Sequence, residues 1–290
     1  LLPFDDCDGW LWLDGRLLPW RDARAHVLSH GLHYASAVFE GERAYGGTIF
    51  RLRDHTNRLL ASARMMDFPL PWTAEEIDAA CDAVVAANGL SDAYVRPVAW
   101  RGAEALGVSD AGGRPHLAIA AWEWGDYYGD RMAGIALSES RWRRPPPDKA
   151  SCLYAIGTLA KRQAEAEGRD DALMLDWRGL VSETTSANVF LAIDGTLHTP
   201  APDCFLDGLT RQTVVRLAKL AQIPVVERAI QPADLDRATE VLLTGTAAEV
   251  TAVRRIGARE YAPGDITARL MRDFDALKRR PAAEVALLVG

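Results

Sequence analysis

Lysine is scarce in this chain, and one lysine stands where its amine could act as a nucleophile. Three of the four, Lys161, Lys219 and Lys278, fall on predicted helices among charged or polar neighbours, where a solvated ammonium group is expected. Lys149 instead follows a run of prolines and is itself followed by small residues. A lysine held among small residues can lose its hydration, which favours the neutral, nucleophilic amine. Position alone leaves an ordinary solvated lysine open as the alternative.

Two segments have the composition of a phosphate-binding site. Residues 208–211, Gly-Leu-Thr-Arg, precede a predicted helix, so backbone N–H groups and the Thr210 hydroxyl could face a phosphate together. Residues 244–248, Thr-Gly-Thr-Ala-Ala, follow a predicted strand, and their small side chains would let a ligand approach the backbone closely. The alternatives are an ordinary threonine cap at the first segment and a plain β-turn at the second.

Glu183 and a group of histidines are weaker candidates. Glu183 follows a strand-like segment and precedes a run of Thr and Ser, where on its own an exposed carboxylate is the simpler interpretation. His26, His30 and His33 have the i, i+4, i+7 spacing of a helical metal site. Gly31 and the lack of an apolar stripe argue against such a helix, so we expect structural histidines and no metal. The glycine motifs typical of dinucleotide, P-loop and serine-hydrolase sites are absent.

The elements that must position these residues fall into two parts, and the first predicts an α+β layer. An Asp-Gly pair at 14–15, between alternating residues, is a hairpin signal. Thr73 and Glu76 form a capping box that opens a helix, and an Asn-Gly pair at 88–89 ends it. Asp54 is expected to cap an earlier helix. Besides the hairpin at 11–20, this part predicts helices at 54–66 and 73–88 and strands at 93–100 and 115–122.

A glycine- and tyrosine-rich segment, residues 125–130, breaks the pattern and predicts a hinge between domains. We therefore expect an N-terminal domain over residues 1–122, an interdomain loop over 123–132 and a C-terminal domain over 133–290. A second Asp-Gly hairpin is predicted at 194–195. The other elements predicted in this part are strands at 133–140, 172–175, 188–193, 224–228 and 240–244, and helices at 153–167, 210–222 and 266–279.

Composition bounds the function. A net charge of −7 and a pI near 5.4 argue against a nucleic-acid surface, which needs clustered Lys and Arg. The four cysteines are scattered without CxxC spacing, which is typical of reduced thiols in a cytosolic protein and indicates neither disulfides nor a zinc site. The apolar runs are too short to span a bilayer, and no export leader opens the chain. We expect a cytoplasmic protein that binds no membrane.

Seven segments, taken in order along nearly the whole chain, carry a family resemblance. They include Phe39-Glu-Gly-Glu-Arg-Ala-Tyr45 and Thr244-Gly-Thr-Ala-Ala-Glu-Val-Thr251, and together they are residues 30–45, 51–59, 93–97, 149 with 154, 179–183 with 188–190, 208–211 and 244–251. In this order they resemble the fold-type IV pyridoxal-phosphate enzymes, and within them the branched-chain amino-acid aminotransferases. The resemblance implies two α/β domains joined by a short interdomain loop.

The resemblance also implies a cofactor and a catalytic lysine. Pyridoxal 5′-phosphate would be bound to Lys149 as a Schiff base, and the lysine would then act as the acid and base of the proton shift. Glu183 would face the pyridine nitrogen and keep it protonated, and Tyr154 would bind the phenolic oxygen. The residues implied to hold the phosphate are Arg58, Leu209, Thr210 and Thr246.

The remaining implied residues bind the substrate. Thr246 and Ala247, with Tyr94 and Arg96, would position the substrate carboxylate. A mostly apolar side-chain pocket would be shaped by Tyr34, Phe39, Leu106, Val108 and Tyr127. In the family the active site lies between the domains and borrows loop residues from a second subunit, so a homodimer is implied.

Three departures from the family pattern bear on substrate range. Residues 151–153, Ser-Cys-Leu, stand where many relatives have Gly-Gly-Asn after the lysine, and residues 184–187, Thr-Thr-Ser-Ala, replace a glycine-rich turn after the glutamate. Both add bulk near the cofactor. The segment between Arg144 and Lys149 is also shorter than in typical relatives. Either this loop is trimmed or residues are missing from it, and we expect the second, because Lys149 needs a properly placed approach.

The activity that the resemblance implies is reversible, ping-pong transfer of an amino group from an aliphatic L-amino acid to 2-oxoglutarate. D-amino-acid and (R)-amine transaminases of the same fold are alternatives that hold the carboxylate differently, and Arg96 favours the branched-chain type. A pyridoxal-phosphate lyase, such as aminodeoxychorismate lyase, would release pyruvate without an amino acceptor. A non-catalytic cofactor-binding protein is disfavoured by the combination of Lys149, Tyr154 and Glu183.

Overall fold

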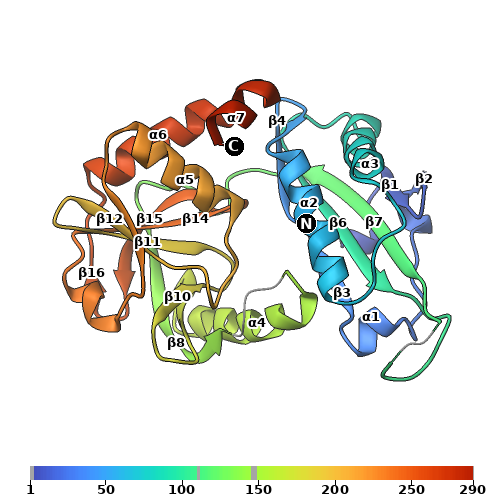
Figure 1. Ribbon diagram of the computed structural model, residues 1–290, viewed down its shortest axis with the longest axis horizontal. Helices are drawn as coiled ribbons and strands as arrows, with labels where there is room; N and C mark the ends of the chain where they lie inside the picture. The colour runs from blue at the N-terminus through green and yellow to red at the C-terminus, as the bar shows by residue number, and fades with distance from the viewer. Residues whose placement is uncertain (1–2, 110–111, 145–148, 290) are drawn as a thin grey trace. The chain divides into compact units, whose positions relative to one another are not determined.

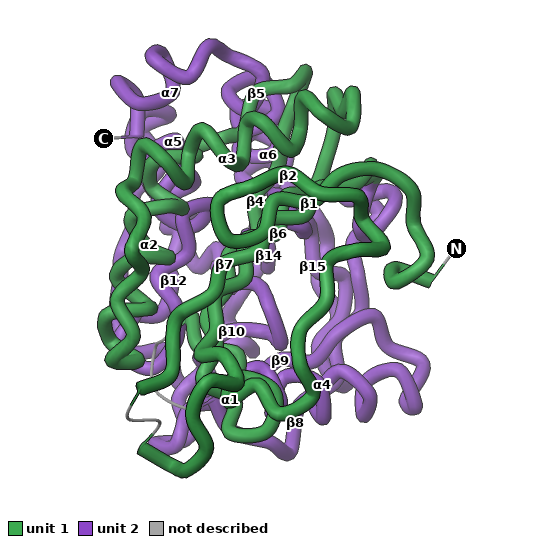
Figure 2. The backbone as a smooth tube through the Cα atoms, turned by 90° about the vertical axis from the view of Figure 1, so that its right-hand side faces the viewer, with its two compact units in different colours: residues 1–125, 149–152 green, residues 126–148, 153–290 purple. Residues whose placement is uncertain are grey.

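The computed structural model describes residues 3–109, 112–144 and 149–289 (Figure 1). The chain forms two compact units (Figure 2). The first contains the residues up to Gly125 together with Lys149–Cys152, and the second contains residues 126–144 and those from Leu153 onward. The first unit therefore ends at the start of the predicted hinge. Lys149, which the sequence placed in the C-terminal domain, groups with the first unit. The short segment 145–148 lies outside the described residues.

The first unit is built on a seven-stranded sheet with the order β2-β1-β7-β6-β4-β5, in which β3 also pairs with β6. Every pairing recorded among its described strands is antiparallel. Its strands are β1 (Trp10–Leu13), β2 (Arg16–Pro19), β3 (Ala37–Phe39), β4 (Glu42–Tyr45), β5 (Thr48–Ile49), β6 (Ala93–Arg101) and β7 (Pro115–Glu123). Its helices are α1 (His30–His33), α2 (Leu52–Met65) and α3 (Ala74–Ala87), with 3₁₀ turns at Phe4–Asp6 and Trp20–Asp22.

Helices α2 and α3 contribute to one apolar core with this sheet. Leu59 of α2 and Ile77 of α3 are fully buried against it. The sheet residues in the same cluster include Val38, Val95 and Leu117, from β3, β6 and β7. This core fixes α2, and with it the polar residues on the same helix, relative to β3 and β6.

The local signals in the first unit are confirmed with one exception. Asp14 and Gly15 both have positive φ, at 49° and 100°, as the tight turn of the β1–β2 hairpin requires. Thr73 and Glu76 form the predicted capping box of α3. The prediction that Asp54 caps α2 was wrong, because the helix begins at Leu52 and its N-cap is Arg51, with φ of 55°. Asp54 lies in the first turn and binds the Arg51 Nε at 2.6 Å.

The second unit is built on a nine-stranded mixed sheet that closes on itself. The strand order is β10-β9-β8-β15-β14-β11-β12-β13, β16 pairs with β15, and β10 also pairs with β11. That extra pairing joins β10, β9, β8, β15, β14 and β11 into a ring, lined by buried residues such as Leu137, Val189 and Leu243. The strands are β8 (Ile135–Arg144), β9 (Asp171–Asp176), β10 (Val181–Thr184), β11 (Asn188–Ile193), β12 (Thr196–Pro200), β13 (Val225–Arg228), β14 (Glu240–Gly245), β15 (Glu249–Ile256) and β16 (Arg259–Glu260).

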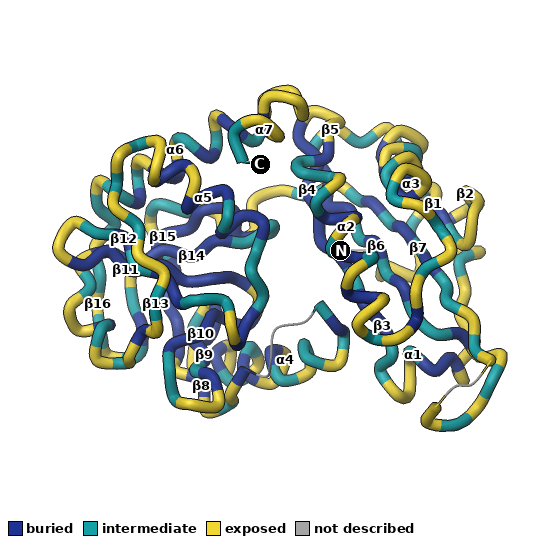
Figure 3. Tube along the Cα trace, viewed as in Figure 1, coloured by how far each residue is buried: buried dark blue, intermediate teal, exposed yellow. Residues whose placement is uncertain are grey.

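Helices cover this sheet at several positions. They are α4 (Ser151–Ala166), α5 (Leu209–Leu220), α6 (Asp265–Leu277) and α7 (Ala282–Val289), with a 3₁₀ turn at Pro232–Asp236. Ala160 and Ala164 of α4 pack on Ala172 and Met174 of β9. Figure 3 shows burial concentrated on the strands and exposure on the loops and outer helix turns.

The predicted elements of the second unit are present, with shifted ends. The Asp194-Gly195 hairpin is confirmed between β11 and β12, and β11 has the predicted bounds. The strand predicted at 133–140 begins at Ile135 and continues to Arg144. The mixture of helices and sheets confirms the α+β expectation. Within the described residues, no helix combines the length and apolar character that crossing a lipid bilayer requires.

Candidate active site

Lys149 is held by the edge of β3 in the first unit. Its carbonyl accepts a hydrogen bond from the Phe39 backbone N–H at 3.4 Å, and the adjacent residues Val38 and Ala150 form an antiparallel bridge. The Lys149 Nζ lies 4.8 Å from the centroid of the Phe39 ring. Ala150 is buried, and α4 begins at the next residue, Ser151. The lysine is thus half-buried and fixed at its backbone, unlike a lysine on a solvated helix face.

Arg58 of α2 takes part in a buried polar cluster of the same unit. Its Nε and Nη2 donate to the two carboxylate oxygens of Glu40, at 2.7 and 2.8 Å. His55 Nδ1 lies 2.7 Å from Glu40 Oε2. Burial alone would raise the pKa of Glu40, but the charge and hydrogen bonds of Arg58 hold it well below its usual range. Burial lowers the pKa of His55, and the positive charges of Arg58 and Lys149 act in the same direction.

Phe39, Tyr94 and Arg96 form a second group next to Lys149. The Arg96 guanidinium carbon lies 4.6 Å from the Phe39 ring centroid and 5.1 Å from that of Tyr94, and its Nη2 donates to the Tyr94 hydroxyl at 2.9 Å. Gly41 permits this arrangement, because a Cβ there would meet the Tyr94 hydroxyl at 2.1 Å. The Phe39 ring therefore lies next to both the Lys149 amine and the Arg96 guanidinium.

Three residues predicted to line the substrate pocket lie on the surface of the first unit. Tyr34, Leu106 and Val108 are exposed, the last two to 75% and 79%. His30 ties their two segments together, because its backbone N–H donates to the Gly102 carbonyl at 2.8 Å and its Nε2 lies 3.1 Å from the Gly107 carbonyl. His30 thus has a structural contact.

Glu183 lies on β10 of the second unit and is buried, so the exposed carboxylate considered as the simpler interpretation is wrong. It forms an ion pair with Arg144, which is equally buried. Asn188 Nδ2 donates to Glu183 Oε2 at 3.0 Å and to the Leu206 carbonyl at 2.9 Å. The Arg144 guanidinium carbon also lies 5.8 Å from the Tyr154 ring centroid. Sequence reasoning missed Arg144, which appeared there only as the residue before the short segment that leads to Lys149.

The start of α5 has no side-chain cap. Gly208 is the N-cap and offers no side-chain cap, so the interpretation of Thr210 as an ordinary cap is wrong. Thr210 is buried in the first turn of the helix. A Cβ at Gly208 would meet Asn188 Oδ1 at 2.2 Å, so this glycine brings the helix start against the residue that binds Glu183. Arg211 is engaged elsewhere, in ion pairs with Asp207 and Glu227.

The segment 244–248 contains the last two residues of β14 and the turn that leads into β15. Thr246 and Ala247 are half-buried in this turn. The Thr244 hydroxyl is buried and has no hydrogen-bond partner among the described residues. Tyr127 is exposed and packs edge-on against Tyr128, with ring centroids 4.5 Å apart. The end of β14 thus carries a buried hydroxyl group that no protein atom of the described segments satisfies.

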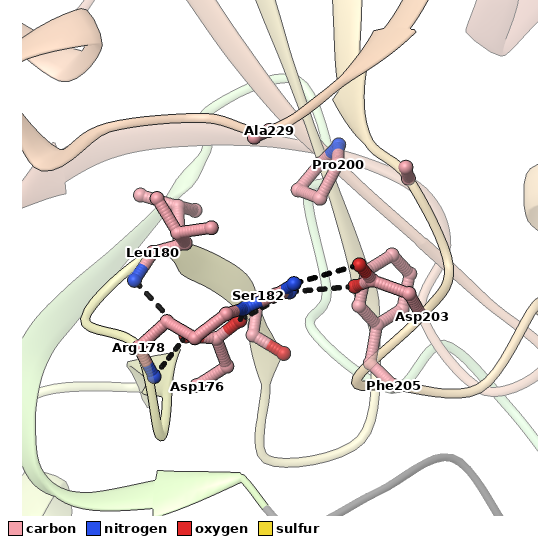
Figure 4. A pocket seen from close by; sticks show the side chains of 10 residues that line it. Asp176, Arg178, Leu180, Ser182, Pro200, Asp203, Phe205 and Ala229 are labelled. Carbon is pink, nitrogen blue, oxygen red and sulfur yellow. Dashed lines mark hydrogen bonds and ion pairs between the residues drawn. The ribbon is translucent and has the colours of Figure 1, made fainter.

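A separate small pocket in the second unit holds ion-paired residues (Figure 4). Arg178 donates to Asp203 at 2.7 and 2.9 Å and to Asp176 at 2.8 Å. Asp176, Asp203 and Cys204 lie close enough to share a cation, but both carboxylates are already bound by Arg178. None of the residues predicted for the site lines this pocket.

The chain is similar to known aminotransferases over most of its length. The family model described as Amino-transferase class IV matches residues 37–256. The branched-chain-amino-acid aminotransferase of Pseudomonas aeruginosa is 39% identical over 284 residues, covering 93% of this chain and 92% of that protein.

Two solved structures show the same fold. One is a branched-chain aminotransferase from the thermophilic archaeon Thermoproteus uzoniensis with norvaline, with a TM-score of 0.92 and 35% identity over 98% of this chain and 99% of that one. The other is the branched-chain amino acid aminotransferase from Thermobaculum terrenum in its PLP-bound holo form, with a TM-score of 0.89 and 30% identity over 98% of each chain. The chain therefore belongs to the class IV aminotransferases, the fold-type IV enzymes that use pyridoxal phosphate, and groups with their branched-chain members.

Proposed function

We propose that this protein transfers the amino group of branched-chain L-amino acids to 2-oxoglutarate by a ping-pong route, with Lys149 as the catalytic residue. The observation that carries the proposal is the fixed, half-buried position of Lys149 against Phe39, in a chain that aligns over nearly its full length with branched-chain aminotransferases. A lysine in this setting can form and break a covalent bond to an aldehyde and move a proton at the substrate carbon.

The residues present fit pyridoxal 5′-phosphate, the cofactor of this family. When bound, the cofactor supplies an electron sink for the substrate's α-carbon. Glu183 is buried and held by Arg144 and Asn188, so a carboxylate is available in a water-poor setting to keep a ring nitrogen protonated. Leu209 and Thr210 are the first two residues of α5, and the macrodipole at a helix N-terminus favours a dianion. We assign the phosphate to these groups with Arg58 and Thr246, and the phenolic oxygen to Tyr154.

The substrate is assigned to two sets of residues. Thr246 and Ala247, with Tyr94 and Arg96, would bind the carboxylate. Arg96, placed on the Phe39 ring near Lys149, supports a second anionic substrate such as 2-oxoglutarate, because a guanidinium can bind a carboxylate through two N–H groups. The apolar part of the pocket is assigned to Tyr34, Phe39, Leu106, Val108 and Tyr127.

A homodimer in the cytoplasm is part of the proposal. Several apolar side chains around α1 and the segment 102–109 are exposed to water in a single copy of the chain. They are Val27, Leu28, Leu32, Leu106 and Val108. His30 joins these two segments through Gly102 and Gly107, and exposed apolar side chains on joined segments are typical of an interface. In sedimentation experiments the wild type should be a dimer. The Leu106→Glu variant should dissociate more readily, because the substitution places a charge among the apolar side chains. A wild-type monomer at micromolar concentration would contradict this part of the proposal.

A substrate panel tests the proposed activity. With 2-oxoglutarate as acceptor, L-leucine should react, whereas D-alanine and a chiral arylamine should not. Turnover of D-alanine or the arylamine in preference to L-leucine would point to the alternative transaminases of the same fold. Release of pyruvate without any amino acceptor would indicate a lyase. Lys149→Ala should lose turnover completely, and retained activity would refute the assignment of Lys149.

A further inference from the structure

The direction of Arg58 is set by a buried acid to which the proposed function gives no task. Glu40 is fully buried in the link between β3 and β4, and its carboxylate binds the Nε and Nη2 edge of Arg58 at 2.7 and 2.8 Å. His55, one turn earlier on α2, brings Nδ1 to 2.7 Å from the same carboxylate. The Glu40 backbone N–H donates to the Pro97 carbonyl of β6 at 2.9 Å. The acid is therefore held from three sides.

We propose that Glu40, supported by His55, is a positioning residue that holds the Arg58 guanidinium in the direction needed to bind the cofactor phosphate. The inference rests on the proposed function. An arginine side chain has many rotamers, and holding one of them before the phosphate arrives reduces the entropy lost on binding. A guanidinium carries five N–H donors, so it can keep Glu40 on one edge and bind a phosphate through another.

Glu40 also has an effect that opposes this role, because its charge has the same sign as the phosphate. If repulsion outweighed positioning, removing the charge would strengthen phosphate binding. The contacts favour positioning, since Arg58 binds the carboxylate directly and offsets its charge, and His55 holds the same carboxylate in place. A glutamine at residue 40 would offer a single acceptor and turn its amide N–H groups toward donors. Weaker binding of the phosphate in the Glu40→Gln variant would therefore indicate positioning, and tighter binding would indicate repulsion.

Glu42 provides a matched control. It is two residues from Glu40, equally buried, and neither of its carboxylate oxygens has a hydrogen-bond partner within the described part of the chain. A Glu42→Gln variant changes the same atoms at the same depth without touching Arg58. Any effect of Glu40→Gln that Glu42→Gln also shows is a general effect of changing a buried acid.

The test compares pyridoxal 5′-phosphate with pyridoxal, which lacks the phosphate, in absorbance titrations of the full chain freed of cofactor. Glu40→Gln should weaken binding of the phosphorylated aldehyde by about 10-fold to 100-fold, the range for losing a hydrogen bond to a charged group, and leave pyridoxal affinity unchanged. Glu42→Gln should leave both affinities at the wild-type values. An equal loss for both ligands would reduce Glu40 to a structural role, and unchanged or tighter binding of the phosphorylated aldehyde would refute the inference.

A second variant covers the case in which Glu40→Gln does not fold, as judged by circular dichroism. His55→Gln removes only the supporting ring and should give a smaller loss, of roughly 3-fold, for the phosphorylated aldehyde alone. Equal losses for the two ligands would again overturn the inference. Failure of the proposed function has a different signature, because the wild type itself would then bind neither ligand at Lys149.

Discussion

Both units contain a buried Arg–Glu ion pair among the residues proposed to bind the cofactor, and the two pairs have opposite assignments. In the first unit Arg58 is the proposed ligand and Glu40 supports it. In the second unit Glu183 is the proposed ligand and Arg144 supports it. A buried ion pair gives little net stability compared with apolar packing, because both charges lose their hydration. Each pair is therefore better explained by what one of its members binds.

The pairs also differ in how the carboxylate is shared. Both oxygens of Glu40 bind Arg58, and His55 adds to one of them. Glu183 divides its oxygens between Arg144 and the neutral amide of Asn188. The first arrangement fixes the direction of a guanidinium, whereas the second fixes the direction of a carboxylate. This contrast makes the effects of single substitutions in the two units different.

The largest expected effect is on turnover in the second unit. Glu183→Gln should lower kcat by roughly 100-fold or more, the range for removing one preorganised charged group from an active site. Steady-state kinetics with L-leucine measures it. Glu240→Gln is the matched control, because Glu240 is a buried glutamate of the same unit that binds the first N–H groups of α6. A Glu183→Gln enzyme within a few-fold of the wild type would remove Glu183 from the assigned role.

The next effect is on stability, and it should separate the two arginines. Arg144→Met removes the charged partner from the buried carboxylate of Glu183, so the free energy of unfolding should fall by about 3–5 kcal/mol. Arg58→Met should cost less, because the Arg58 side chain is 17% exposed and Glu40 keeps His55. Urea denaturation measures both. Only Arg58→Met should lose the preference for pyridoxal 5′-phosphate over pyridoxal. Loss of that preference in Arg144→Met, with Arg58→Met unaffected, would contradict the assigned roles of the two arginines.

A smaller effect concerns Glu42, whose burial raises its pKa well above the usual 4.5, with the nearby charges of Glu40 and Asp78 adding to the shift. The folded state keeps this proton while the unfolded state releases it, so the wild type loses stability as pH rises above about 4.5. Glu42→Gln should therefore gain stability over the wild type between pH 5 and 7, by at most about 1.4 kcal/mol per pH unit. Below about pH 4 the difference should stop changing with pH, because both states then hold the proton, and a constant difference across the whole range would contradict the shift.

The smallest effect lies away from both pairs. Thr73→Ala removes half of the α3 capping box and should cost about 1 kcal/mol of unfolding free energy. Turnover and cofactor affinity should stay at the wild-type values, because α3 carries none of the assigned residues. A loss of cofactor affinity in this variant would mean that general destabilisation of the first unit lowers cofactor binding. The effects of Arg58 and Glu40 substitutions could then no longer be assigned to the loss of specific contacts.

The local features could be predicted from sequence because their causes are local. The Asp-Gly turns, the Thr73 capping box and the strand Asn188–Ile193 depend on neighbouring residues, and all are present. The start of α2 was misplaced, because Arg51, in the left-handed conformation, is the N-cap, and Asp54 lies inside the first turn and binds the Arg51 side chain. The closure of the ring through β10 and β11 had no signal in any single segment, since closure depends on pairing across the sheet.

The candidate site divides in the same way. Lys149, Glu183 and Thr210 stood out because of their residue types and flanking segments. The ion-pair partners of Glu183 and Arg58 could not be predicted in this way. Arg144 is far from Glu183 in sequence, and Glu40 meets Arg58 only when α2 packs on the first sheet. Burial of Glu183 also depends on β10 closing the ring. Spacing along the chain carries no information about such partners.

Reduction of the loaded enzyme with borohydride, followed by peptide mass spectrometry, tests the central claim most directly. The phosphopyridoxyl group should be found on the peptide that contains Lys149, and Lys149→Ala should carry none. A group on Lys161, Lys219 or Lys278 in place of Lys149, or no labelled lysine in an enzyme that still turns over, would contradict the account.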